Sequence, residues 1–262
     1  GQRGLGSLWT LVGALEHGAR RGPKNEVGAV IVKGLYLLLM GLTFLGPFTR
    51  AFEPRIRYIG QTKHLLVGTL FMMALFIPWD VVKTASGVWG FNNDYLVGPS
   101  LWGLPLEEWL FFVVVPWATF FIYEVLQLFF PWTQSKQSAF VVVEMIAAAS
   151  ATFALVYHDR WYTLTAAGGL ALGSTWLLWK RPWWTAAFLR SWGVGLIPFF
   201  IVNGVLTGMF LPEPIVWYNN AENMGLRLGT IPVEDALYGT FMMLMYTAGV
   251  HWSRQRFPKR PE

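Results

Sequence analysis

Cysteine is absent from this chain of 262 residues, and charged residues are scarce. The lack of cysteine excludes disulfides, thiolate nucleophiles, cysteine-ligated zinc and iron–sulfur clusters. Asp, Glu, Lys and Arg make up 13% of the residues, against about 25% in soluble domains. The four histidines are dispersed and form no metal-ligating pattern. These deficits exclude thiol chemistry and argue against a soluble domain.

Apolar and aromatic residues take the place of the missing charge. Hydrophobic residues make up 54% of the chain, and 15 residues are tryptophan. Seven apolar runs approach or exceed the roughly 18 to 20 residues that cross a bilayer. They lie at about 27–46, 62–82, 106–128, 137–157, 161–179, 188–210 and 232–250. The pattern predicts an all-α, polytopic membrane bundle of about seven transmembrane helices. We expect residues 1–26 to be an N-terminal extension or interfacial helix, and residues 251–262 to be a basic tail.

Basic residues are distributed unevenly between the two ends of this predicted bundle. The connections opposite the N-terminal side hold twelve Lys and Arg residues, counting the C-terminal tail. Beyond residue 26, the N-terminal side holds only four, which are Lys33, Lys83, Arg160 and Arg227. The positive-inside rule therefore predicts that the basic loops and the C-terminus are cytoplasmic, in a multi-pass protein of the cell membrane. Four basic residues within 1–26 oppose this orientation. The net charge of +5 is explained by topology, and we expect no nucleic-acid partner.

An internal repeat divides the chain. Residues 91–108 align with residues 218–235 at an offset of 127 without a gap, and ten of the 18 positions are identical or conservative. The identical pairs are Asn92/Asn219, Asn93/Asn220, Gly98/Gly225, Leu101/Leu228, Pro105/Pro232 and Glu107/Glu234. We predict two parallel three-helix repeats, residues 27–128 and 161–250, joined by a linker helix within 129–160. In such an arrangement the site is expected between the halves.

Acidic residues in the apolar spans are the first candidates for chemistry. Seven of the 15 acids lie within or at the edge of a span, whereas Lys33 is the one basic residue inside a span. Ion pairs therefore cannot neutralise these acids. A charge near the bilayer centre costs about 2.5 to 3.5 kcal/mol, so a neutral, protonated carboxyl is the cheaper state. A neutral carboxyl can act as a general acid.

Five of these acids form the predicted catalytic set. Pro-x-Glu at a helix start usually serves only as a cap, but here the motif is duplicated and a second acid follows each copy. Proline suits the first helical turn, where the helix dipole acts on the neighbouring acid. Asp80, four residues before a threonine, has a counterpart in Asn203. In order of preference, the predicted catalytic residues are Glu107, Glu234, Glu108, Asp235 and Asp80.

Aromatic and amide side chains around the motifs are candidates for substrate binding. An aromatic ring face stabilises a nearby cation by about 0.5 to 2 kcal/mol. The same aromatics are also typical of packing and of interfacial belts. Asparagines in the motifs serve equally well as turn formers or as groups that hold the carboxylates. The candidates are Trp89, Phe91, Asn92, Trp217, Tyr218, Asn219 and Asn203.

Four stretches carry a resemblance to a known family. They are PWDVVKTASGVWGFN (78–92), LPLEEWLFFVVVPWATFFIYE (104–124), IPFFIVNGVLTG (197–208) and IPVED (231–235). These stretches resemble the lycopene cyclase domain family, in the fused two-repeat form of the heterodimeric-type carotenoid beta-cyclases. The second half departs from the first where Asn203 stands in place of Asp80.

The resemblance implies a lycopene beta-cyclase, an intramolecular lyase or isomerase that forms β-ionone rings with no net redox change. Carboxyl groups would transfer the protons, so no cofactor or metal is expected. The implied partners are lycopene or a related linear carotenoid, the lipid bilayer and other carotenoid-pathway enzymes.

Other functions fit parts of the same pattern. A carotenoid hydratase shares the first proton transfer, and a prenyltransferase-like isoprenoid enzyme also uses acids between helices, although it needs clustered aspartates. A secondary transporter also combines parallel repeats with buried acids. A retinal-binding protein is excluded because the last span has no lysine for a Schiff base.

Overall fold

Seven long helices dominate the computed structural model, which describes residues 32–131 and 136–258. They are α3 (Leu35–Arg50), α4 (Thr62–Ala85), α5 (Leu106–Phe129), α6 (Lys136–Val156), α7 (Trp161–Lys180), α8 (Thr185–Leu206) and α9 (Val233–Arg256). Short elements fill the connections: β1 (Trp89–Phe91), β2 (Ser100–Leu101), β3 (Leu104–Pro105), β4 (Val216–Tyr218), β5 (Arg227–Leu228), β6 (Ile231–Pro232), and the 3₁₀ helices η1 (Ile59–Gln61) and η2 (Asn93–Tyr95). The predicted all-α helical bundle is confirmed.

Several helix boundaries differ from the prediction, among them the ends of α8, α9 and α3. Helix α9 continues to Arg256, so the first half of the predicted basic tail is helical. Arg254 explains the extension, because its guanidinium donates to Glu124 Oε1 of α5 at 2.7 Å and anchors the last turn. Helix α3 ends at Arg50, later than the apolar run suggested. The predicted N-terminal extension, residues 1–26, lies outside the described residues.

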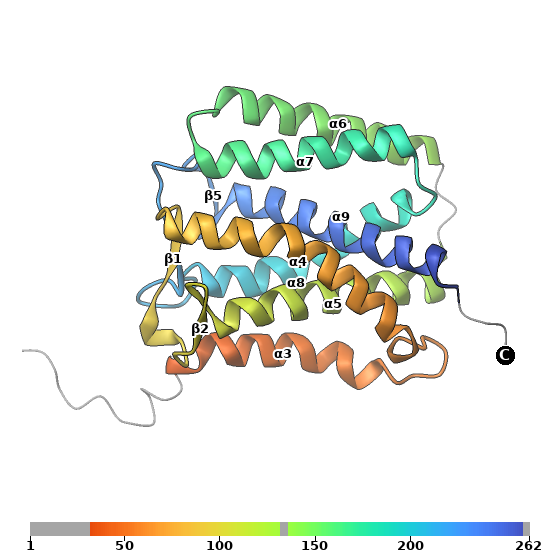
Figure 1. The fold of residues 1–262 in the computed structure, drawn as a ribbon, viewed down its shortest axis with the longest axis horizontal. Coiled ribbons are helices and arrows are strands. Elements are labelled where there is room, and N and C mark those ends of the chain that lie inside the picture. The colour runs from red at the N-terminus through yellow and green to blue at the C-terminus, as the bar shows by residue number, and fades with distance from the viewer. Residues whose placement is uncertain (1–31, 132–135, 259–262) are drawn as a thin grey trace, which may run out of the picture.

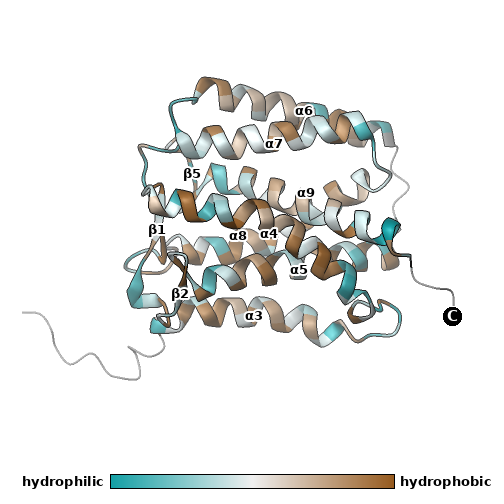
Figure 2. Ribbon diagram, viewed as in Figure 1, coloured by the Kyte–Doolittle hydropathy of each residue, from teal (hydrophilic) through white to brown (hydrophobic). Residues whose placement is uncertain are grey.

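Within the part of the chain that the structure describes, four helical segments are long and apolar enough to cross a membrane. They are Ile59–Ala85, Leu106–Phe129, Gln137–Val156 and Thr185–Leu206, and α3 is a shorter apolar helix. Helix α9 is less apolar because two acids occupy its first turn and two arginines its last. In Figure 2 hydrophilic residues are concentrated in the connections at the two ends of the bundle. The bundle therefore fits a membrane environment.

The two halves run in parallel and pack across one another. Helices α3, α4 and α5 have the same directions as α7, α8 and α9 (Figure 1). Helix α4 packs on α9, and its counterpart α8 packs on α5. Helix α6 links the halves and covers α7 and α8. The core is therefore shared between the halves.

A small sheet joins the halves at one end of the bundle. Strand β1 pairs antiparallel with β4, and Gly90 faces Trp217, its equivalent in the repeat. Because a Cβ at Gly90 would overlap the Trp217 ring, only glycine permits this close approach. The sheet brings the two long connections together at the end where α5 and α9 begin (Figure 1).

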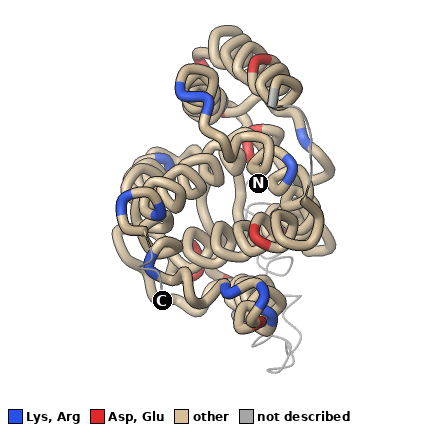
Figure 3. The backbone as a smooth tube through the Cα atoms, turned by 90° about the vertical axis from the view of Figure 1, so that its right-hand side faces the viewer, with Lys and Arg blue, Asp and Glu red and all other residues tan. Residues whose placement is uncertain are grey.

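The opposite end of the bundle is rich in basic residues. Figure 3 looks onto that end, where Lys and Arg are more prominent than Asp and Glu. Lys83, at the other end of the bundle, lies in the last turn of α4 and is buried. Its Nζ donates to the carbonyl oxygen of Trp161 at 2.9 Å and lies 3.8 Å from the Trp161 ring centroid. This lysine therefore ties α4 to α7.

Candidate active site

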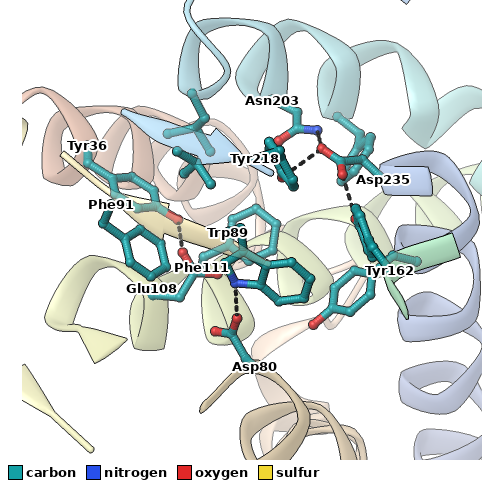
Figure 4. A pocket seen from close by; sticks show the side chains of 14 residues that line it. Tyr36, Asp80, Trp89, Phe91, Glu108, Phe111, Tyr162, Asn203, Tyr218 and Asp235 are labelled. Atoms are coloured by element: carbon teal, nitrogen blue, oxygen red, sulfur yellow. Dashed lines mark hydrogen bonds between the residues drawn. The ribbon is translucent and has the colours of Figure 1, made fainter. Parts of the chain in front are cut away.

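A small cavity of about 50 Å³ lies between the halves, beside the β1–β4 sheet. Three acids, one amide, eight aromatic residues and two aliphatic residues line it, and the lining includes no lysine or arginine. The lining consists of Tyr36, Asp80, Trp89, Phe91, Glu108, Phe111, Tyr162, Phe199, Asn203, Leu206, Val216, Tyr218, Asp235 and Tyr238. Figure 4 shows the acids arranged around Trp89. The predicted position between the two repeats thus contains a polar site with apolar walls.

The first half contributes Glu108 and Asp80. Glu108 lies in the first turn of α5, and the hydroxyl of Tyr36 on α3 donates to its Oε2 at 2.6 Å. Asp80 lies near the end of α4, and the indole N–H of Trp89 donates to its Oδ1 at 2.7 Å. The other oxygen of Asp80, Oδ2, is buried and has no hydrogen-bond partner among the described residues. Each of these acids therefore accepts a single side-chain hydrogen bond.

The second half contributes Asp235, which is held more firmly. Its Oδ1 accepts the hydroxyl of Tyr162 at 2.5 Å, and its Oδ2 accepts the amide of Asn203 at 2.7 Å and the hydroxyl of Tyr218 at 2.9 Å. Burial, followed by the charge of Asp235, raises the pKa of Tyr218 well above its ordinary value. The Tyr218 hydroxyl therefore keeps its proton and remains a donor.

The two halves share one feature of the site and differ in two. A tyrosine on the first helix bonds the acid on the third helix in both, as Tyr36–Glu108 and Tyr162–Asp235. In contrast, Asn203 replaces Asp80, and Tyr218 occupies the repeat position of Phe91. The extra donors around the second acid come from these two replacements.

Glu107 and Glu234, which the sequence ranked first, are buried beside the cavity but are not among its lining residues. Glu107 Oε1 accepts the backbone N–H of Val97 at 2.7 Å, and Glu234 Oε1 accepts that of Met224 at the same distance. Thr163 also donates to Glu234 at 2.6 Å. Each glutamate thus ties a long connection to the start of the following helix.

The predicted substrate-binding residues divide into two groups. Trp89, Phe91, Tyr218 and Asn203 line the cavity. Asn92 and Asn219 instead accept the backbone N–H groups of Asp94 and Ala221, each at 3.0 Å, so they act as turn formers. Trp217 is 43% exposed and covers Gly90 outside the cavity.

Several lining residues were not predicted as site residues, most notably Tyr36 and Tyr162. Their separation is 126 residues, one fewer than the offset of the motif. An alignment of the repeat with a single one-residue gap would have paired them. Tyr238, Phe111 and Phe199 lie within long helices and carry no comparable repeat signal.

Aromatic rings surround the acids closely. The Trp89 ring centroid lies 5.0 Å from that of Tyr162, 6.2 Å from Tyr238 and 6.3 Å from Tyr218. Such walls can stabilise a cation formed between them, by about 0.5 to 2 kcal/mol per ring. The arrangement therefore combines proton donors and acceptors with aromatic walls that tolerate a cation.

Comparisons with known proteins identify the family of the chain. Residues 33–126 and 159–253 match a family model described as lycopene cyclase, and the two segments correspond to the two three-helix halves. A bifunctional lycopene cyclase/phytoene synthase from Podospora anserina is 28% identical over 180 residues, covering 65% of this chain and 29% of that protein. One of the same description from Leptosphaeria maculans is 26% identical over 193 residues, covering 70% of this chain and 31% of that protein. The chain thus spans less than a third of the length of these relatives. No solved structure matches it.

Proposed function

Because the chain belongs to the lycopene cyclase family, we propose that it closes β-ionone rings on the end groups of lycopene or a related linear carotenoid. The observation that carries the proposal is the meeting of Asp80, Glu108 and Asp235, from both halves, in an aromatic cavity lined by no basic residue. A hydrocarbon substrate offers no group for hydrogen bonds, so apolar walls must bind it. The acids then serve the reaction itself.

The reaction is an isomerisation by proton transfer. A carboxylic acid protonates the terminal C=C bond of the end group and leaves a tertiary carbocation. An internal C=C bond attacks this cation, so that a six-membered ring forms and the positive charge moves onto the ring. A carboxylate removes a proton from a ring carbon, and the electron pair of that C–H bond becomes the new double bond. One proton enters and one leaves, so no redox partner is required.

The hydrogen bonds favour a division of labour among the acids. Asp235 accepts three side-chain donors, and donors stabilise the carboxylate form. Asp80 Oδ2 has no partner among the described residues, so a proton on that oxygen has no competing acceptor and is available to the substrate. We assign Asp80, with Glu108 beside it, to the acid step and Asp235 to proton removal.

Glu107 and Glu234 act as positioning residues in this proposal. Each holds a loop backbone N–H and immediately precedes an acid that lines the cavity. They set the first turns of α5 and α9, from which Glu108 and Asp235 project.

Location in the membrane follows from the substrate. A linear carotenoid dissolves in the bilayer, and the four apolar helical segments fit that environment. We place the protein in the cell membrane with its basic end in the cytoplasm, as the positive-inside rule predicts.

The test is expression in cells that accumulate lycopene, followed by chromatography of their pigments. Ring-bearing carotenoids are expected, and Asp80→Asn, Glu108→Gln and Asp235→Asn should each lower their yield by about 10²-fold or more. Glu213→Gln is the matched control, because this acid lies at the same end but contacts Asn92 outside the cavity. Full activity in all three cavity variants would remove these acids from the mechanism. A hydroxylated linear product would indicate a hydratase instead.

A further inference from the structure

A second, apolar cavity of about 400 Å³ lies between α3, α5 and α8. Aliphatic side chains such as Leu39, Val115 and Val202 dominate its lining, and no charged residue contributes to it. Two threonines are its polar members, and the hydroxyl of one, Thr43, is engaged with the carbonyl of Leu39 at 2.8 Å. The lining of this cavity is therefore suited to contact with a hydrocarbon.

This second cavity, called the groove below, adjoins the acid-lined cavity. Phe111 of α5 and Phe199 of α8 line both spaces. Phe111 lies one helical turn from Glu108, and Phe199 lies one turn from Asn203, so each ring shares a helix face with a polar residue of the site. The two rings stand where the groove meets the site.

The groove borders the surface that faces lipid. Leu42 of α3 and Ile201 of α8 line it and remain 58% and 65% exposed. Pro47 and Pro198, also in the lining, lie inside these two helices. An interior proline removes a backbone hydrogen bond and disturbs regular helix geometry, which favours a gap between α3 and α8.

The equivalent place in the other half is filled. The repeat offset of 126 places Gly169 and Gly173 of α7 where α3 has Thr43 and Pro47. A Cβ at Gly169 would lie 2.8 Å from the Phe241 ring and 3.4 Å from the Trp79 ring. Helix α7 therefore packs directly on aromatic side chains, so the groove belongs to one half only among the described residues.

We propose that the groove between α3 and α8 binds the polyene chain of the substrate while its end group occupies the acid-lined cavity. This inference rests on the proposed function and adds the route of entry, sideways from the bilayer past Phe111 and Phe199. The α3 lining from Leu39 to Pro47 covers nine residues, and the eight steps between them rise about 12 Å along the helix. The groove thus holds the chain next to the end group, and the rest of the carotenoid stays in lipid.

The experiment fills the groove and compares two substrates in lipid vesicles. Two variants, Ala118→Phe and Val202→Trp, place a larger side chain in the open space of the groove. The second copies Trp79, the equivalent residue of the other half. Leu172→Trp, on a residue of α7 that is 74% exposed, is the matched control. The substrates are lycopene and a truncated analogue with the same end group and a chain too short to enter the groove. Conversion of lycopene should fall at least about ten-fold in both groove variants, as steric misfit in an apolar pocket does, while the analogue and the control variant behave as wild type.

Equal conversion of lycopene by the groove variants and wild type would overturn the inference, and so would an equal loss of both substrates. Binding is measured separately, as the lycopene that co-purifies with the protein. Loss of bound lycopene in the groove variants, in a protein that makes no ring, would support the groove and reject the proposed function. Unchanged binding would reject the groove.

Discussion

At the scale of single residues, the chemistry of the site depends on how many donors reach each carboxyl group. Asp235 is held by Tyr162, Asn203 and Tyr218, whereas Asp80 accepts only the Trp89 indole. Carboxyl groups of the same kind can therefore hold different protonation states within one cavity.

The hydroxyl of Tyr218 provides a graded test of this difference. Tyr218→Phe removes one donor from Asp235 and creates the residue that the first half already has in Phe91. A neutral hydrogen bond contributes about 0.5 to 1.5 kcal/mol, so ring formation should fall by about two- to ten-fold. Initial rates of cyclisation in vesicles measure the effect. A loss as large as that of Asp235→Asn would contradict the supporting role of Tyr218.

Substitution by glutamine or by alanine distinguishes a positioning role from a catalytic role at Glu107 and Glu234. Glutamine keeps the Oε1 acceptor that holds Val97 or Met224, but it cannot transfer a proton. Glu107→Gln and Glu234→Gln should therefore retain most cyclisation, whereas the alanine variants lose it together with stability. Pigment yield at equal protein level is the measurement. Inactive but well-folded glutamine variants would instead assign these glutamates to proton transfer, as the sequence first suggested.

At the scale of helices, glycine sets how closely α4 and α9 approach. A Cβ at Gly249 of α9 would lie 3.0 Å from the Cα of Gly68 on α4 and 2.9 Å from the Phe71 side chain. Small residues allow such close packing where helices meet in membranes. Helix α4 also carries Asp80, and helix α9 carries Asp235.

Overpacking should therefore damage this crossing selectively. Gly249→Leu is expected to destabilise the protein by about 1 to 3 kcal/mol, seen as a lower melting temperature in detergent. Gly41→Leu on α3 is the control, since nothing lies within 4 Å of a Cβ placed there. Equal melting temperatures for the two variants would show that the crossing tolerates bulk.

At the scale of the whole molecule, neither half holds a complete site. Asp80 and Glu108 come from α4 and α5, whereas Asp235 comes from α9. The core pairs, α4 with α9 and α5 with α8, also join the halves. A chain divided between α5 and α6 should therefore regain activity only when both pieces are made together.

Co-expression tests this dependence directly. Residues 1–133 and 134–262, produced from separate genes in lycopene-accumulating cells, are expected to form rings together and to form none individually. The undivided chain is the control. Ring formation by either piece alone would show that one half suffices for the chemistry.

The sequence by itself determined the fold class and the parallel repeat, and it predicted a site between the halves. Apolar runs long enough to cross a bilayer leave helices as the way to satisfy the backbone, and the uninterrupted motif offset revealed two equivalent halves. Five residues that line the cavity were among the sequence candidates, because polar and aromatic residues stand out beside apolar spans: Asp80, Glu108, Asp235, Trp89 and Tyr218.

Only the tertiary structure decided which acid of each pair faces the cavity. Neighbouring residues on a helix point about 100° apart, and the direction of the cavity depends on how the halves pack, which no local pattern encodes. Glu107 therefore turns to the Val97 backbone while Glu108 faces Tyr36. The apolar groove arose in the same way, because residues of α3, α5 and α8 that are distant in sequence meet only after packing.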